Sequence, residues 1–155
     1  MTAKFAALSA RKDLLIVDTP AGALEDVSEA VVLADFTVLV VRPTLIDLSG
    51  LARSLTLVRR LGKPSIVVIN QAPFARENIE PPLVKRALRG LDYMRAPVAP
   101  VILRARSVYQ TALETGRSVE ESSDLAAAEE IAALWAFVEA ELADAPLAQR
   151  SALDG

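Results

Sequence analysis

Apolar runs of strand length alternate along the chain with segments whose apolar residues recur at helical spacing. Four runs, at 14–17, 36–41, 65–69 and 101–103, are rich in aliphatic residues and have the length of buried strands. Because strands and helices alternate, we expect an α/β fold with a mostly parallel sheet of about four strands and helices on both faces. The crossovers between parallel strands should be right-handed.

Helical spacing is found in five segments, which lie at about 24–33, 47–61, 81–91, 107–114 and 124–143. Asp47 or Ser49 is expected to cap the second helix, and Gly62 to end it. Gly116 is expected to end the fourth helix. In the last helix, Trp135 shares the apolar face, which predicts a core position.

The first apolar run, 14–17, ends in a carboxylate, Asp18, and Thr19, Pro20 and Gly22 follow at once. Its composition predicts a strand buried on both faces, and proline and glycine then begin a loop. An acid at the carboxyl end of a parallel strand lies where open α/β sheets bind ligands. The alternative is a strand that ends in a polar turn, for which Asp is a common residue.

Length and composition predict the domain organisation and exclude several classes of functional site. The 155 residues predict one domain, 1–144, with a flexible tail at 145–155. The chain has no cysteine and no histidine, which excludes a disulfide framework, a thiol nucleophile, a Ser-His-Asp triad and an ordinary zinc site. The sequence from Met1 shows no signal peptide, and no apolar run could span a bilayer, so we expect a cytoplasmic protein.

Charge is unevenly distributed. Residues 1–113 carry 15 Lys/Arg and 10 Asp/Glu, whereas residues 114–144 carry one basic residue and nine acids. We interpret the two parts as solvated faces of opposite sign.

Five motifs occur in an order and spacing that together are informative. They are Asp13-Leu-Leu-Ile-Val-Asp18-Thr-Pro, Ala34-Asp35-Phe-Thr-Val-Leu-Val-Val, Pro43 with Asp47-Leu48, Val67-Val-Ile-Asn70, and Ala112 with Gly116-Arg-Ser-Val. In this order they resemble the ParA/MinD family of deviant P-loop ATPases, which segregate plasmids and chromosomes or position the division machinery. The resemblance covers about residues 13–142 and implies a P-loop NTPase-like fold.

The resemblance implies roles for matching positions. Asp18 would be the catalytic-site acid that holds Mg²⁺ through water, which suits a hard cation that keeps several waters. Thr19, Pro20 and Gly22 would form the loop that senses the γ-phosphate of ATP. Asn70 would read the adenine, since its amide offers both a donor and an acceptor. The alternatives are that Asp18 caps a turn and that Asn70 only stabilises one.

The family's glycine-rich loop, which ends in Gly-Lys-Thr or Gly-Lys-Ser, does not occur in this sequence. The chain therefore resembles the C-terminal two-thirds of the family, an incomplete domain without the P-loop unit. In the family, the strand that feeds this loop lies between the counterparts of 14–17 and 36–41. We expect either a rearranged four-stranded sheet or dependence on a partner strand.

Three functions remain open at this point. The first is a ParA/MinD-like ATPase domain for partitioning, N-terminally truncated and weak or inactive in ATP hydrolysis alone. The second is a non-catalytic interaction module that pairs with a full-length ParA-like protein. The third is a different P-loop-derived or Rossmann-like binding domain.

The resemblance also implies partners. They are a second copy or a full-length ParA-like protein, a ParB-like adaptor, and DNA bound without sequence preference. Basic residues that could contact DNA by counterion release are Lys85, Arg86, Arg89, Arg95, Arg104 and Arg106, with a solvated helix face as the alternative. A membrane anchor is not expected, because the polar side of the last helix is acidic.

Overall fold

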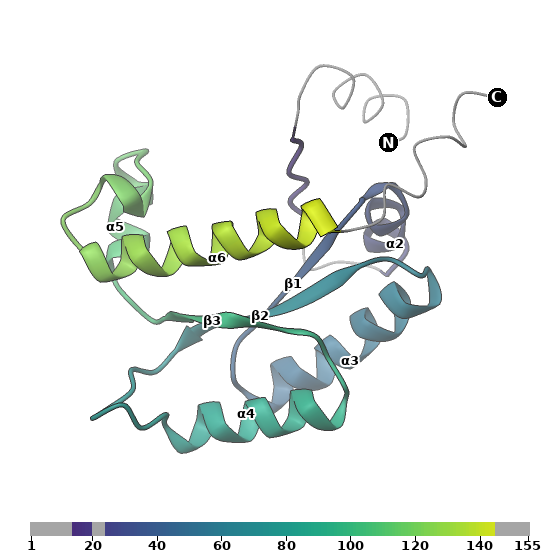
Figure 1. The fold of residues 1–155 in the computed structure, drawn as a ribbon, viewed down its shortest axis with the longest axis horizontal. Helices are drawn as coiled ribbons and strands as arrows, with labels where there is room; N and C mark the ends of the chain where they lie inside the picture. The colour runs from purple at the N-terminus through teal and green to yellow at the C-terminus, as the bar shows by residue number, and fades with distance from the viewer. Residues whose placement is uncertain (1–13, 20–23, 145–155) are drawn as a thin grey trace.

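The computed structural model describes residues 14–19 and 24–144, in three layers around a parallel sheet (Figure 1). Helices α3 and α4 lie on one side of the sheet and α6 lies on the other. The elements are α2 (Leu24–Leu33), β1 (Thr37–Val41), α3 (Leu45–Arg60), β2 (Ser65–Ala72), α4 (Pro82–Tyr93), β3 (Val98–Arg104), α5 (Val108–Glu114), the 3₁₀ turn η1 (Val119–Glu121) and α6 (Leu125–Asp144).

The sheet has the order β1-β2-β3, and both neighbouring pairs are parallel. The β1–β2 register runs without interruption from Thr37 opposite Ser65 to Val41 opposite Ile69. The expectation of an α/β fold with helices on both faces of a parallel sheet is therefore confirmed. Within the described residues the sheet has three strands rather than about four.

The strand predicted at 14–17 is the missing one, and this prediction is wrong. These residues form no strand, and three of their four apolar side chains are exposed, with Ile16 at 74%, Leu14 at 45% and Val17 at 42%. A strand exists only by hydrogen bonding to a neighbour, and no described strand pairs with this run. The sheet is therefore not rearranged to join 14–17 to β1, and the outer edge of β1 has no neighbour among the described residues.

The other strands form where expected and extend further. β2 continues past Ile69 through Asn70 to Ala72. Its pairing with β3 shifts register twice, once between Val67 and Ile69 and again between Ile69 and Ala72. Gln71 has a φ of 52°, a left-handed conformation that fits an irregularity of this kind. The predicted run at 101–103 is the centre of a longer β3.

The helices agree with their predicted positions to within a few residues. Thr44, rather than Asp47 or Ser49, caps α3, since its hydroxyl accepts a hydrogen bond from the Asp47 N–H at 3.2 Å. Gly62 lies at the predicted end of α3 with a φ of 63°, a conformation that glycine adopts without strain.

Two apolar clusters hold the layers together. On one side, Val67 and Ile69 of β2 are fully buried against α3 and α4, together with Leu55 and Leu91. On the other side, α6 packs on β2 and β3; its apolar residues there are Ile131, Leu134, Phe137, Val138 and Leu142. Trp135 was expected in this core, but 38% of it is exposed.

Two further expectations concern the C-terminal tail and membrane-spanning helices. The flexible tail proposed for 145–155 lies outside the described residues, so that prediction stays open. Among the helices that the structure describes, none combines the length and apolar character needed to cross a membrane.

Candidate functional site at the carboxyl end of the sheet

The predicted phosphate-facing residues are only partly described. Asp18 and Thr19 are both exposed, and they follow a run that has not joined the sheet. Pro20 and Gly22 lie outside the described residues. Asp18 is therefore a solvated carboxylate here, and it does not follow a strand of the described sheet, contrary to the prediction.

Asn70 lies near the carboxyl end of β2, at the irregular part of the strand. Its Oδ1 accepts a hydrogen bond from the Gln71 N–H at 2.8 Å. The amide acceptor is thus engaged by the neighbouring backbone, as in the turn-stabilising alternative. Two N–H donors of the side chain would remain for a ligand.

Three residues that follow β1 along the chain form a compact polar group. The Arg42 guanidinium donates to both Asp47 oxygens, at 3.0 and 3.1 Å, and the Thr44 hydroxyl donates to the same carboxylate at 2.5 Å. These hydrogen bonds, first from Arg42 and then from Thr44, hold the pKa of Asp47 below its usual value. The sequence predicted Asp47 as a helix cap. Instead, its carboxylate accepts a hydrogen bond from the hydroxyl of Thr44, which is the capping residue.

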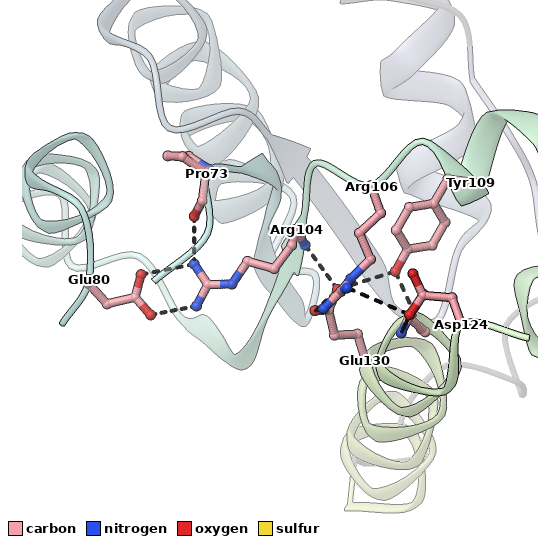
Figure 2. Close-up of polar contacts among 8 residues, drawn as sticks. Pro73, Glu80, Arg104, Arg106, Tyr109, Asp124 and Glu130 are labelled. Carbon is pink, nitrogen blue, oxygen red and sulfur yellow. Dashed lines mark hydrogen bonds and ion pairs between the residues drawn. The ribbon is translucent and has the colours of Figure 1, made fainter. Parts of the chain in front are cut away.

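The largest polar cluster lies at the carboxyl end of β3, where Arg104 forms hydrogen bonds with three other segments of the chain (Figure 2). Its guanidinium donates to the two oxygens of Glu80, at 2.5 and 2.9 Å, and to the Pro73 carbonyl at 3.0 Å. Its backbone N–H donates to Glu130 of α6 at 3.0 Å. The hydrogen bonds from Arg104 hold the pKa of Glu80 below its usual value.

Arg106 extends this cluster toward α5 and α6. It donates to Glu130 Oε1 at 2.8 and 3.2 Å and pairs with Asp124 at 3.6 Å. The Tyr109 hydroxyl lies 3.3 Å from Glu130 (Figure 2). Burial, followed by the negative charge of Glu130, raises the pKa of Tyr109 to about 12. Arg106 also lies over the ring of Phe74, 5.0 Å from its centroid.

This cluster, which we call the β3 ion cluster, comprises Glu80, Arg104, Arg106, Tyr109, Asp124 and Glu130. Two guanidinium groups meet three carboxylates, so the cations are already neutralised by protein. Arg104 and Arg106 are therefore engaged by protein carboxylates, which disfavours phosphate contacts at these two positions. Their part in a DNA-binding patch stays a prediction. No local pattern in the sequence reveals the cluster, because the bonded partners lie between 18 and 26 residues apart along the chain.

The other candidate DNA contacts lie on α4 and directly after it. Lys85, Arg86, Arg89 and Arg95 are all exposed. On the opposite side of the sheet, α6 contains five acidic residues and no basic one. The two helical layers thus carry opposite charge, which the uneven charge distribution along the sequence anticipated in part.

The described residues do not make a complete site for Mg²⁺ and ATP. No group of three acidic side chains that could hold a metal ion occurs in 14–19 or 24–144. Hollows of about 390 and 320 Å³ lie along α3 and between α5 and η1, and neither has Asp18 or Asn70 in its lining. Asp18 suits an outer, water-mediated contact with Mg²⁺, but nothing described would surround the phosphates.

A comparison with solved structures finds a protein with a similar fold. The crystal structure of the cell division ATPase MinD from Pyrococcus furiosus matches with a TM-score of 0.68 and 19% sequence identity. The match covers 86% of this chain and 54% of the MinD chain. The chain has a MinD-like α/β fold. It spans about half the length of MinD, and at this identity the match establishes the fold alone.

Sequence comparisons give no further assignment. No protein-family model matches the chain, and no curated protein matches it. The MinD-like fold agrees with the architecture that the ParA/MinD resemblance implied.

Proposed function

We propose that the chain is a ParA/MinD-like domain of the nucleotide-dependent partitioning or division-positioning kind, with negligible ATP hydrolysis by itself. The observation that carries the proposal is the MinD-like fold. The Asp18-Thr19 and Asn70 motifs support it, because they occur in the order that the resemblance requires. The cofactors implied are ATP and Mg²⁺.

The lack of hydrolysis follows from the residues present. Catalysis of phosphoryl transfer depends almost entirely on positioning and electrostatic stabilisation of the phosphates. The sequence has no glycine-rich loop with a lysine, and the two arginines of the β3 ion cluster are paired with carboxylates. Any contact with nucleotide would then rest on Asp18, Thr19 and Asn70.

A steady-state ATPase assay with Mg²⁺, combined with calorimetry, tests this proposal. We expect turnover at the level of a protein-free blank and a Kd for MgATP weaker than about 1 mM. Asp18→Ala should weaken that binding, and Asp35→Ala, which removes another exposed acid, should leave it unchanged. Rapid turnover, or tight binding abolished by Asp18→Ala, would show that the site is complete and the proposal wrong.

One observation favours a second candidate, a non-catalytic module that pairs with a full-length ParA-like protein. The acceptor of Asn70 is already bonded to Gln71, and Arg104 and Arg106, at and just after the end of β3, are paired with carboxylates. In this case MgATP should not bind at any concentration, and Asp18→Ala should have no effect on binding. The same calorimetric experiment therefore distinguishes the two candidates.

Non-specific DNA binding belongs to the same proposal. Its support is the exposure of Lys85, Arg86 and Arg89 on α4, with Arg95 just beyond. These cations would act on phosphates by counterion release, without reading sequence. A ParB-like adaptor and a full-length ParA-like protein are the further partners that the proposal includes.

A further inference from the structure

The two helical layers carry unpaired charges of opposite sign on their outer sides. α3 and α4 lie on one side of the sheet and α6 lies on the other (Figure 1). Within residues 14–19 and 24–144, no ion pair is formed by four exposed arginines of α3 and α4, which are Arg53, Arg60, Arg86 and Arg89. The same is true of the exposed Glu129 and Glu139 of α6. These charges are available to another molecule.

On α4, the outward stripe is basic and aromatic. Val84 and Leu91 are buried in the core between this helix and the sheet. Because an α-helix has about 3.6 residues per turn, Arg86, Arg89 and Tyr93 lie on its opposite side. Tyr93 is 90% exposed, and Arg and Tyr are residue types enriched among the residues that dominate protein interfaces. The stripe therefore has the composition of a protein-binding surface.

α3 extends this surface with two further arginines. Leu51 and Leu55 are buried in the same core, so Arg53 and Arg60 lie on the outward side of the helix. α3 and α4 contact each other, which brings their outward sides into one layer. We call this surface the α3–α4 face; it comprises Arg53, Arg60, Arg86, Arg89 and Tyr93.

The outward side of α6 combines acidic and small residues. Val138 is buried against β2 and β3, so Glu129, Ala132 and Ala136 lie on the opposite side, where all three are exposed. Glu139, also exposed, borders this stripe. We call these four residues the α6 face.

The two faces are complementary in size and in charge. The α3–α4 face has large side chains, whereas the α6 face has alanines at its centre, and the distance between packed helices depends on the size of the side chains at the contact. Arginine stems can lie along an apolar surface while their guanidinium groups reach carboxylates. Because the faces lie on opposite sides of the sheet, they cannot meet within one copy. They can meet only between copies.

We propose that the α3–α4 face of one copy binds the α6 face of a second copy. The contact joins two different surfaces, so each copy keeps one face free and association can continue beyond two copies. α4 has 12 residues and is about 18 Å long, so the contact is small and its affinity is weak. Its strength depends on ionic strength, because the charges are exposed.

The contact needs no nucleotide, and it uses neither Asp18 nor Asn70. Sedimentation of the whole chain at up to about 1 mM should show reversible self-association at about 20 mM salt. This association should be lost at about 0.5 M salt, where the Debye length falls to about 4 Å. A chain that stays monomeric at low salt, or associates equally at both salt concentrations, overturns the proposal.

Double charge reversals locate the two faces. Arg86→Glu with Arg89→Glu reverses the α3–α4 face, and Glu129→Lys with Glu139→Lys reverses the α6 face. Each variant alone should self-associate more weakly by about tenfold or more, because attractions become repulsions. An equimolar mixture should associate again, since each variant keeps the face that the other has lost. If the variants are folded by circular dichroism and the mixture does not associate, the proposed pairing is wrong.

A control variant and a separate assay complete the test. Arg117→Glu reverses an exposed cation outside both faces and should associate as the unmodified chain does. An equal loss in this variant would mean that total charge, rather than the two faces, governs association. The contact shares α4 with the proposed DNA contact, but association is measured without DNA. A chain that binds no DNA would therefore contradict only that part of the proposed function.

Discussion

Arg104 donates two hydrogen bonds to the carboxylate of Glu80, and this contact joins the end of β3 to the segment that leads into α4. The side chains are 15% and 28% exposed, so the pair is shielded from solvent to a large extent. The same guanidinium also donates to the Pro73 carbonyl, so three segments meet at one side chain. The contact fixes the strand end at the edge of the sheet where ligands of α/β proteins bind.

Loss of Arg104 should lower stability. Arg104→Ala leaves Glu80 and the Pro73 carbonyl without their partner, which should cost about 1–3 kcal/mol of the free energy of unfolding. Arg95→Ala, at an exposed position, should change it by less than about 0.5 kcal/mol. Urea denaturation measures both variants. Equal small effects would mean that the Arg104–Glu80 pair contributes nothing to the fold.

The same pair predicts an acid sensitivity. Arg104 holds the pKa of Glu80 below the usual 4.5, so the folded chain binds this proton less readily than the unfolded chain. The stabilisation is therefore complete above the unfolded pKa and is lost as the pH falls through the folded pKa. Glu80→Gln should reduce the fall in stability below pH 4.5, measured as the melting temperature against pH. A fall of unchanged size in this variant would place the acid sensitivity elsewhere.

Tyr109 predicts a sensitivity at high pH. Its pKa is raised to about 12, chiefly by burial, so the folded state resists ionisation of the phenol. The resulting stabilisation is present below the unfolded pKa of about 10 and is lost as the pH rises through the folded pKa. An ultraviolet titration should show a tyrosinate transition near 12 that Tyr109→Phe removes and Tyr93→Phe retains. If Tyr93→Phe removes it instead, the burial of Tyr109 does not control its ionisation.

DNA binding, if carried by α4, should depend on its exposed cations. The double variant Arg86→Glu and Arg89→Glu should weaken binding to a random-sequence duplex and reduce its salt dependence. Loss of two phosphate contacts lowers the slope of log K against log salt by about 2. Arg117→Glu, which reverses the charge of one exposed cation beyond α5, is the single-site control for charge reversal away from α4. Unchanged binding by the α4 variant would leave that face as a solvated surface.

Much of the fold was predictable because its signals are local. The helices end at residues that impose their own geometry, such as Gly62 and Gly116, both with positive φ. The apolar runs that became β1 and β2 have the composition of strands buried in a parallel sheet. The cap of α3 was misassigned to Asp47 or Ser49 because all three candidates, with Thr44, are good capping residues.

The errors concern pairing between distant segments. The run at 14–17 has strand composition, yet no described strand lies beside it, and composition cannot report a missing neighbour. Likewise, Arg104 and Arg106 had the appearance of free cations until Glu80 and Glu130 were brought to them by the fold. Of the predicted site, Asp18, Thr19 and Asn70 keep their proposed roles as predictions, and Pro20 and Gly22 lie outside the described residues.

The most direct test of the proposed function is a nuclear magnetic resonance titration of the isotope-labelled chain with MgATP. We predict small, saturable shifts confined to the backbone amides around Asp18, Thr19 and Asn70, with half-saturation above about 1 mM. Such shifts would place a weak nucleotide contact at the residues that the ParA/MinD resemblance selects. The absence of shifts at these amides, or half-saturation in the micromolar range, would contradict the account.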